Sequence, residues 1–138
     1  MNQPSLACSP ERLHVLIVTE FAETGAAIAS LLEDDDLIST CTRDCVVQVM
    51  RGSGDCAINV VLLDVEPWPN GLSEFVFDAR RGSAAPLLLL AVIHGPDERM
   101  RKLFSAAGID HLFDRAGDFK DLLAVLEARR TTSLDHGR

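Results

Sequence analysis

Short apolar runs alternate along the chain with segments whose apolar residues recur every three or four positions. An apolar run of four to eight residues predicts a strand, and near-continuous runs rich in Val, Ile and Leu predict strands buried on both faces. The predicted strands are His14–Val18, Leu37–Thr42, Ile58–Leu63, Leu87–Ile93 and His111–Asp114. The alternation indicates that each strand is followed by a helix.

The segments between the runs carry the helical spacing of apolar residues. The expected inward-facing positions are Ile28, Leu31 and Leu32; Val46, Val49 and Met50; Leu72, Phe75, Val76 and Ala79; Met100, Leu103, Phe104 and Ala107; and Phe119, Leu122, Leu123 and Leu126. Pro96 is expected at the first position of the fourth helix and Gly108 at its end, and Asp118 is expected to cap the fifth. The first helix is expected over Glu23–Glu33.

Five strand-helix units in succession predict an α/β fold with a parallel sheet covered by helices on both faces. We expect a doubly wound five-stranded parallel sheet, (βα)5, with the flavodoxin-like strand order 2-1-3-4-5. The expected organisation is a disordered lead-in over 1–11, one domain over 12–130, and a polar tail or linker start over 131–138.

Composition agrees with this fold class and disfavours several classes of function. The 138 residues are 47% hydrophobic and carry a net charge of −8, which disfavours direct contact with nucleic acid. The four cysteines form no Cys-x-x-Cys pair, so reduced thiols in a reducing compartment are expected. Neither a signal peptide nor a membrane-spanning run is evident, and a cytoplasmic location is expected.

Charged residues stand at the ends of three predicted strands. Thr19-Glu20 follows the first strand, Asp64 and then Glu66 follow the third, and Asp114-Arg115 ends the fifth. In doubly wound sheets, sites lie beyond the carboxyl ends of the strands where the strand order reverses, here between strands one and three. Carboxylates that converge there favour a hard divalent cation such as Mg²⁺, although strand-end carboxylates that are simply solvated would show the same pattern.

From Leu13 to Arg130 the chain resembles the receiver domain of two-component response regulators. Thr19-Glu20 stands where that family has an acidic pair, and Asp64 stands at its phosphoacceptor aspartate. The other matching residues are Pro69 and Gly71 in the following loop, Gly108 before the fifth strand, and the basic Arg115 after it.

The resemblance implies a signalling function rather than an enzyme. Asp64 would accept a phosphoryl group from a sensor histidine kinase or phosphotransfer protein, and Arg115 would contact that group. Glu20, Asp64 and the backbone carbonyl of Glu66 would hold Mg²⁺. A homodimer through the fourth helix, fifth strand and fifth helix is a further expectation, and no membrane or nucleic-acid partner is expected.

Several positions depart from the family pattern. Thr19 replaces the first acidic residue, and Arg115 replaces a lysine. The switch hydroxyl falls at Ala91 or Ile93, depending on the direction of counting, and Leu112 takes the place of the switch aromatic. These departures describe an atypical receiver, or alternatively a pseudo-receiver that serves as an interaction or dimerisation module without phosphotransfer.

A third hypothesis is a flavodoxin-like flavin-binding protein, because flavodoxins share the predicted strand order. Thr24-Gly25 after the first strand is a weak hint of a phosphate loop, and Trp68 could stack on a flavin ring. A hydrolase is disfavoured, since no Gly-x-Ser-x-Gly elbow is present and no nucleophile pairs obviously with a histidine.

Overall fold

The computed structural model describes residues 13–30, 37–42, 45–51, 58–64, 71–83, 86–117 and 119–136. The predicted lead-in over 1–11, the acidic residues 33–36 and the predicted Asp118 cap lie outside these ranges. So do three residues singled out in the loop after the third strand, Glu66, Trp68 and Pro69.

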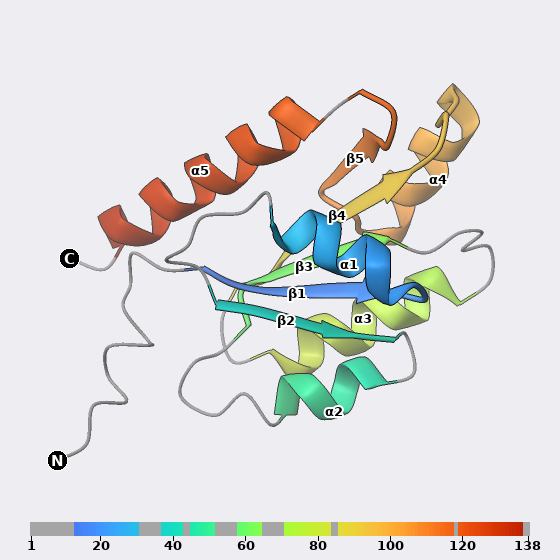
Figure 1. The fold of residues 1–138 in the computed structure, drawn as a ribbon. Helices are drawn as coiled ribbons and strands as arrows, with labels where there is room; N and C mark the ends of the chain where they lie inside the picture. Colours follow the sequence, from blue (N-terminus) through green and yellow to red (C-terminus); the bar gives the residue numbers. More distant parts are fainter. Residues whose placement is uncertain are drawn as a thin grey trace, which may run out of the picture.

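Five strands form one all-parallel sheet in the order β2-β1-β3-β4-β5, which confirms the predicted order (Figure 1). The strands are β1 (His14–Thr19), β2 (Leu37–Cys41), β3 (Val60–Asp64), β4 (Leu88–Ile93) and β5 (His111–Asp114). Because all strands run the same way, their carboxyl ends share one edge of the sheet. Strand β3 is the middle strand of the five.

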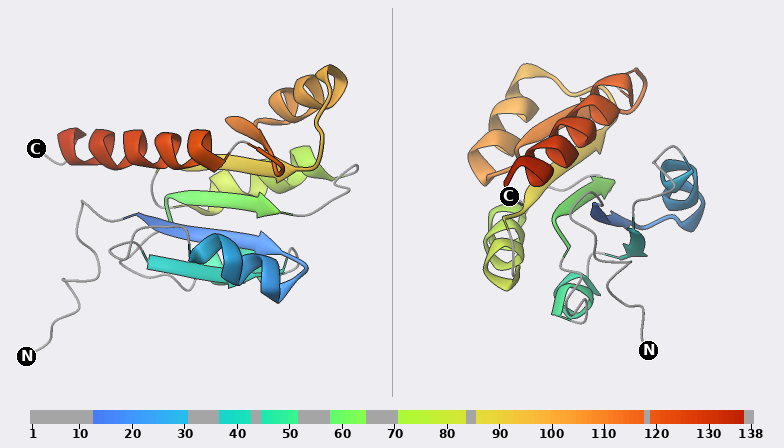
Figure 2. Two further views of the ribbon diagram at one scale, coloured as in Figure 1. Left: turned by 45° about the horizontal axis from the view of Figure 1, so that its top comes forward. Right: turned by 90° about the vertical axis from the view of Figure 1, so that its left-hand side faces the viewer.

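Helices cover both faces of the sheet (Figures 1 and 2). They are α1 (Ala22–Ala29), α2 (Val46–Arg51), α3 (Leu72–Gly82), α4 (Glu98–Ala107) and α5 (Phe119–His136). Four of them have eight or more residues, whereas α2 has only six. Helices α1 and α5 pack on one face, and α2, α3 and α4 pack on the other. Helix α5 ends at His136 and therefore includes most of the predicted polar tail over 131–138.

The sheet separates two apolar clusters, and successive strand residues alternate between them. Leu16 and Val18 join the cluster under α2, α3 and α4, whereas Val15 and Ile17 join the cluster under α1 and α5. This alternation follows from the two-residue period of a strand. It explains why the central strands are apolar at nearly every position.

Two leucines that were expected to face inward do not. Leu103 on α4 is 57% exposed, and Leu123 on α5 is 38% exposed. On α4, which lies beside the edge strand β5, Phe104 is the buried residue and Met100 and Ala107 are half-buried, so the inward face of this helix is narrow and Leu103 lies outside it. Pro96 also precedes the helix, because Asp97 is the N-cap and its Oδ1 accepts the Met100 N–H at 2.8 Å.

An arginine-carboxylate pair connects three elements near the amino end of β4. Arg80 on α3 donates to the carbonyls of Leu87 (2.8 Å) and Gly108 (2.9 Å) and to Asp110 Oδ2 (3.2 Å). That same carboxylate oxygen accepts the Leu89 N–H at 2.8 Å, and the Asp110 N–H donates back to the Leu89 carbonyl. We call this set the Arg80 clamp. It fixes the loop before β5 onto α3 and β4.

Backbone conformation and close packing explain the predicted glycine at the end of α4. Gly108 is the C-cap, with φ at +105°, a conformation that side chains with a Cβ rarely adopt. A Cβ there would lie 2.8 Å from Val76 Cγ1 on α3. The predicted helix end at Gly108 is confirmed, and close packing between α3 and α4 is the second reason for glycine.

Within the described residues, no helix has both the length and the apolar character needed to cross a membrane.

Candidate functional site

Asp64 is the last residue of the middle strand and is only 2% exposed. Apart from Thr19, it is the only polar residue among the buried ones that the structure describes. Burying a carboxylate is costly unless it is paired and hydrogen-bonded. The contacts that compensate Asp64 therefore define the candidate site.

Arg115 supplies the compensating charge. It follows β5 directly, and its backbone N–H donates to the Ile93 carbonyl at 2.8 Å, which carries the turn along the end of β4. From there its guanidinium reaches Asp64, and Nη2 donates to Oδ1 in an ion pair. The Asp64 side chain is 1% exposed and that of Arg115 is 39% exposed, so the charge pair lies at the mouth of the site.

Thr19 contacts the other carboxylate oxygen of Asp64. Its Cα is paired in register with that of Asp64, and its hydroxyl lies 3.3 Å from Asp64 Oδ2. The same hydroxyl is 3.3 Å from the Phe21 carbonyl and accepts the Phe21 N–H at 3.1 Å. From the sequence, Thr19 is only the replacement of an acidic residue. Its side chain instead joins Asp64 to the start of α1.

Asp114 orders the backbone around Arg115. Its Oδ1 accepts the Ala116 N–H at 3.0 Å and the Gly95 N–H at 3.3 Å. These two backbone hydrogen bonds lower the pKa of the Asp114 carboxyl below its ordinary value. The carboxylate thus links the loop after β4 to the turn that presents Arg115.

The predicted Mg²⁺ ligands are only partly brought together. Glu20 is exposed and follows Thr19 at the strand end next to Asp64, whereas Glu66 lies outside the described residues. Across the part of the chain that is described, no three His, Cys, Asp or Glu residues form a group that could hold a metal ion. Mg²⁺ commonly keeps several waters and needs only one or two carboxylates, so the donor chemistry of Glu20 and Asp64 fits such an ion.

Strand β4 brings no hydroxyl to this edge of the sheet. The two candidate switch positions, Ala91 and Ile93, are each 1% exposed and apolar. Leu112, which stands at the switch aromatic position, is half-buried and packs against the cluster under α4.

Gly25, considered above as part of a phosphate loop, is a buried position within α1. A Cβ there would lie 3.1 Å from Thr19 Cγ2 and 3.5 Å from Thr40 Cγ2. Close packing of α1 on the sheet therefore accounts for this glycine.

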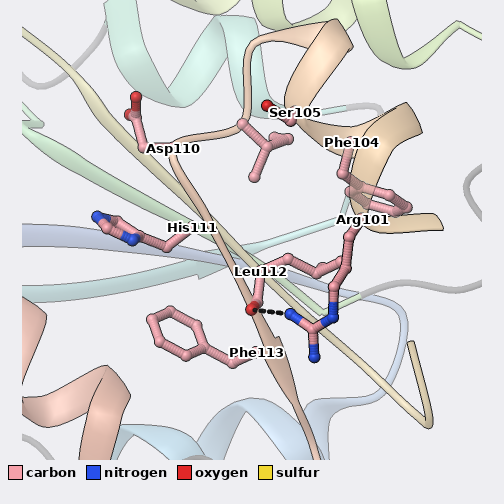
Figure 3. Close-up of a pocket in the computed structure, with 8 residues that line it drawn as sticks. Arg101, Phe104, Ser105, Asp110, His111, Leu112 and Phe113 are labelled. Carbon is pink, nitrogen blue, oxygen red and sulfur yellow. Dashed lines mark hydrogen bonds between the residues drawn. The ribbon is translucent and has the colours of Figure 1, made fainter. Parts of the chain in front are cut away.

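A hollow lies between α4 and the edge strand β5, with a volume of about 290 Å³ (Figure 3). Its rim includes Arg101, whose Nη1 donates to the Leu112 carbonyl at 3.5 Å, and the exposed Ser105 and His111. The ring of His111 stacks on that of Phe113 with centroids 6.1 Å apart. Sequence reasoning missed this hollow, because its lining is assembled by the packing of α4 beside β5.

Comparisons with protein-family models, with curated proteins and with solved structures find no match for this chain.

Proposed function

We propose that the chain is a receiver-type domain of two-component signalling with a flavodoxin-like (βα)5 fold, and that Asp64 accepts a phosphoryl group. One observation carries the proposal. The buried carboxylate at the carboxyl end of the middle strand is contacted by a cation from the end of β5 and a hydroxyl from the end of β1. Such convergence at the switch point is typical of ligand and reaction sites in doubly wound sheets.

In the proposed reaction an Asp64 oxygen attacks the phosphorus of a phosphohistidine on a sensor kinase or phosphotransfer protein. The new O–P bond forms as the N–P bond breaks, and the imidazole leaves with the electron pair. Oδ2 is the better nucleophile, since its 3.3 Å contact with Thr19 is weaker than the ion pair at Oδ1. Arg115 compensates the charge that the phosphoryl oxygens add.

Glu20 and Asp64, with the carbonyl of Glu66, would hold Mg²⁺ in this proposal. When bound, the ion supplies charge neutralisation for the phosphoryl oxygens. Arg115 then shares this task, and its partly exposed side chain has room to move from Asp64 Oδ1 to a phosphoryl oxygen.

A pseudo-receiver is the second candidate, and a specific observation favours it. Both Asp64 oxygens are already engaged, and β4 offers alanine or isoleucine where the family has a switch hydroxyl. In that case the Asp64–Arg115 pair is permanent, and the domain acts through its surface.

The expected partners follow from the same proposal. They are a cytoplasmic kinase or phosphotransfer protein and a second copy of the chain bound through α4, β5 and α5. Sedimentation velocity with and without a phosphoryl donor tests the homodimer. A monomer under both conditions at high concentration contradicts it.

The proposal is tested by incubating the chain with acetyl phosphate and Mg²⁺ and measuring the intact mass. We expect the mass of one phosphoryl group to be added, and beryllofluoride to shift the amide resonances around Asp64. Asp78→Asn, on the exposed side of α3, is the surface control and should label normally. No added mass together with no response to beryllofluoride would favour the pseudo-receiver.

A further inference from the structure

One side chain connects the buried carboxylate of Asp64 with the start of α1. Thr19 is buried at the end of β1, and its hydroxyl lies 3.3 Å from Asp64 Oδ2 and 3.3 Å from the Phe21 carbonyl oxygen. The same hydroxyl oxygen accepts the Phe21 N–H at 3.1 Å. A threonine hydroxyl has one proton to donate. The carboxylate oxygen and the carbonyl oxygen therefore compete for this proton.

The charge on Asp64 decides this competition. An ionised carboxylate is the stronger acceptor, since hydrogen bonds to charged groups are roughly twice as strong as neutral ones. Both separations exceed the usual O–H···O range of about 2.5–3.0 Å, so neither contact locks the hydroxyl. The hydroxyl donates to Oδ2 while Asp64 is ionised. Once Oδ2 loses its charge, the Phe21 carbonyl becomes the better acceptor.

The Phe21 carbonyl belongs to the first turn of α1. It accepts the Gly25 N–H at 3.1 Å, the first hydrogen bond of the helix. Phe21 is the N-cap residue, and its side chain is exposed and makes no capping hydrogen bond. A carbonyl oxygen can accept two hydrogen bonds, so the hydroxyl of Thr19 and the N–H of Gly25 can share it. A change at Thr19 therefore reaches a turn that presents an aromatic ring at the surface.

The methyl group of Thr19 packs against the same helix. Gly25 is buried, and a Cβ built on it would lie only 3.1 Å from Thr19 Cγ2. The methyl and the hydroxyl share one Cβ, so the packing that fixes the methyl also fixes the position of Oγ1. The proton can then change acceptor by rotation about the Cβ–Oγ1 bond alone, while the heavy atoms stay in place.

We propose that Thr19 relays the charge of the Asp64 carboxylate to the first turn of α1. The hydroxyl donates to Oδ2 while Asp64 is ionised, and it turns to the Phe21 carbonyl when Oδ2 is esterified or replaced by a neutral amide. The proton stays on Oγ1 throughout, so no covalent bond to Thr19 forms or breaks. Phosphorylation as the event that neutralises Oδ2 rests on the proposed function, whereas the relay itself does not.

The relay is tested by NMR on the full chain, with the ¹³C resonance of the Phe21 carbonyl as the readout. Asp64→Asn supplies the neutral form without any phosphoryl donor. Its amide oxygen should face Arg115, which donates at the Oδ1 position, so its NH₂ group faces Thr19 and cannot accept a proton. We expect the Phe21 carbonyl resonance to move downfield in Asp64→Asn, because the hydroxyl now donates to it.

A double-mutant comparison separates the relay from a direct effect of the lost charge. In Thr19→Val or Thr19→Ala, adding Asp64→Asn should leave the carbonyl resonance unmoved, because no hydroxyl is present. Two hydroxyl-free variants are used in case one fails to fold, and Thr19→Ser should retain the response. Thr40→Val is the matched control. Thr40 Cγ2 also faces Gly25, but it lies on β2 with β1 between it and β3, so the response should persist.

Treatment with acetyl phosphate and Mg²⁺ should give the same downfield movement in the wild type, while intact mass reports the labelling separately. A chain without added mass contradicts the proposed function, and the Asp64→Asn comparison still decides the relay. The relay is overturned if the Phe21 carbonyl resonance does not move in Asp64→Asn. It is also overturned if that resonance moves by the same amount when the Thr19 hydroxyl is absent.

Discussion

Two arginine-aspartate pairs connect distant segments of this chain, and they differ in what surrounds the carboxylate. The two arginine side chains are about equally exposed, at 39% for Arg115 and 40% for Arg80. The two aspartate side chains differ, at 1% for Asp64 and 38% for Asp110. The Arg80 clamp bonds mainly to backbone groups, whereas Arg115 reaches a side chain that would otherwise be a buried charge.

The difference separates a structural pair from a candidate site. A half-exposed ion pair contributes little by itself, typically about 0–1 kcal/mol, and the clamp owes its value to the carbonyls and the N–H that it satisfies. A buried ion pair adds little net stability, because the cost of desolvating the carboxylate offsets its attraction to the arginine. A gain in stability therefore does not explain the burial of Asp64, and this burial supports the proposal that Asp64 is a phosphoacceptor.

The largest loss of stability is expected from a backbone change at the Arg80 clamp. Gly108→Ala places a Cβ at φ +105° and 2.8 Å from Val76 Cγ1. Strain and overlap together should lower the free energy of unfolding by about 2–4 kcal/mol, measured by urea denaturation. Gly117→Ala, where a Cβ meets nothing within 4 Å, is the matched control. Equal small losses in both variants would mean that the contact between α3 and α4 adapts.

In the Asp64–Arg115 pair, removal of the arginine should lower the free energy of unfolding more than removal of the aspartate. Arg115→Gln leaves a buried carboxylate without its cation and should cost about 1–3 kcal/mol of unfolding free energy. Asp64→Asn releases an arginine that can turn to solvent, and should change stability by less than about 1 kcal/mol. Adding Asp64→Asn to Arg115→Gln should restore most of the loss. Equal costs for the two single variants would contradict the assignment of Asp64 as the buried member.

The Arg80–Asp110 pair should show a small coupling energy. In a double-mutant cycle with Arg80→Gln and Asp110→Asn, we expect less than about 1 kcal/mol, because both side chains are well exposed. Arg80→Gln alone should cost more than this coupling, since the carbonyls of Leu87 and Gly108 lose their donor. A coupling larger than that at Arg115–Asp64 would reverse the comparison.

Asp114 should give the smallest effect on stability, and that effect should be lost in acid. Its pKa is lowered in the folded chain, so its contribution is present above the unfolded pKa and is lost as pH falls through the folded value. The stability difference between wild type and Asp114→Asn should therefore shrink from pH 6 to pH 3. Urea midpoints at the two pH values measure it. A difference that grows in acid would mean that the backbone bonds to Asp114 do not favour its charged form.

The fold followed from the sequence because its signals are local. Val60 to Leu63 has an apolar side chain at every position, and only a strand covered on both faces buries all of them. The errors arose where burial depends on a neighbour. Leu103 has the right helical spacing, but α4 packs beside an edge strand and its buried face is narrow.

In the candidate site, too, some features could be predicted from the sequence and others could not. Asp64 and Arg115 could be placed at one edge from strand order alone, because strand ends are fixed by topology. The Thr19 bond to Asp64 depends on the register of β1 with β3, and the Arg80 clamp depends on tertiary distances. No spacing in the sequence encodes either of them.

The central claim is that Asp64 is reactive and Asp110 is structural. The most direct measurement compares Asp64→Asn with Asp110→Asn after acetyl phosphate and Mg²⁺ treatment, by intact mass and by peptide mapping of the modified residue. We predict that wild type and Asp110→Asn gain one phosphoryl group on Asp64, while Asp64→Asn stays folded and gains none. Equal labelling of Asp64→Asn, or no labelling of the wild type, would contradict the account.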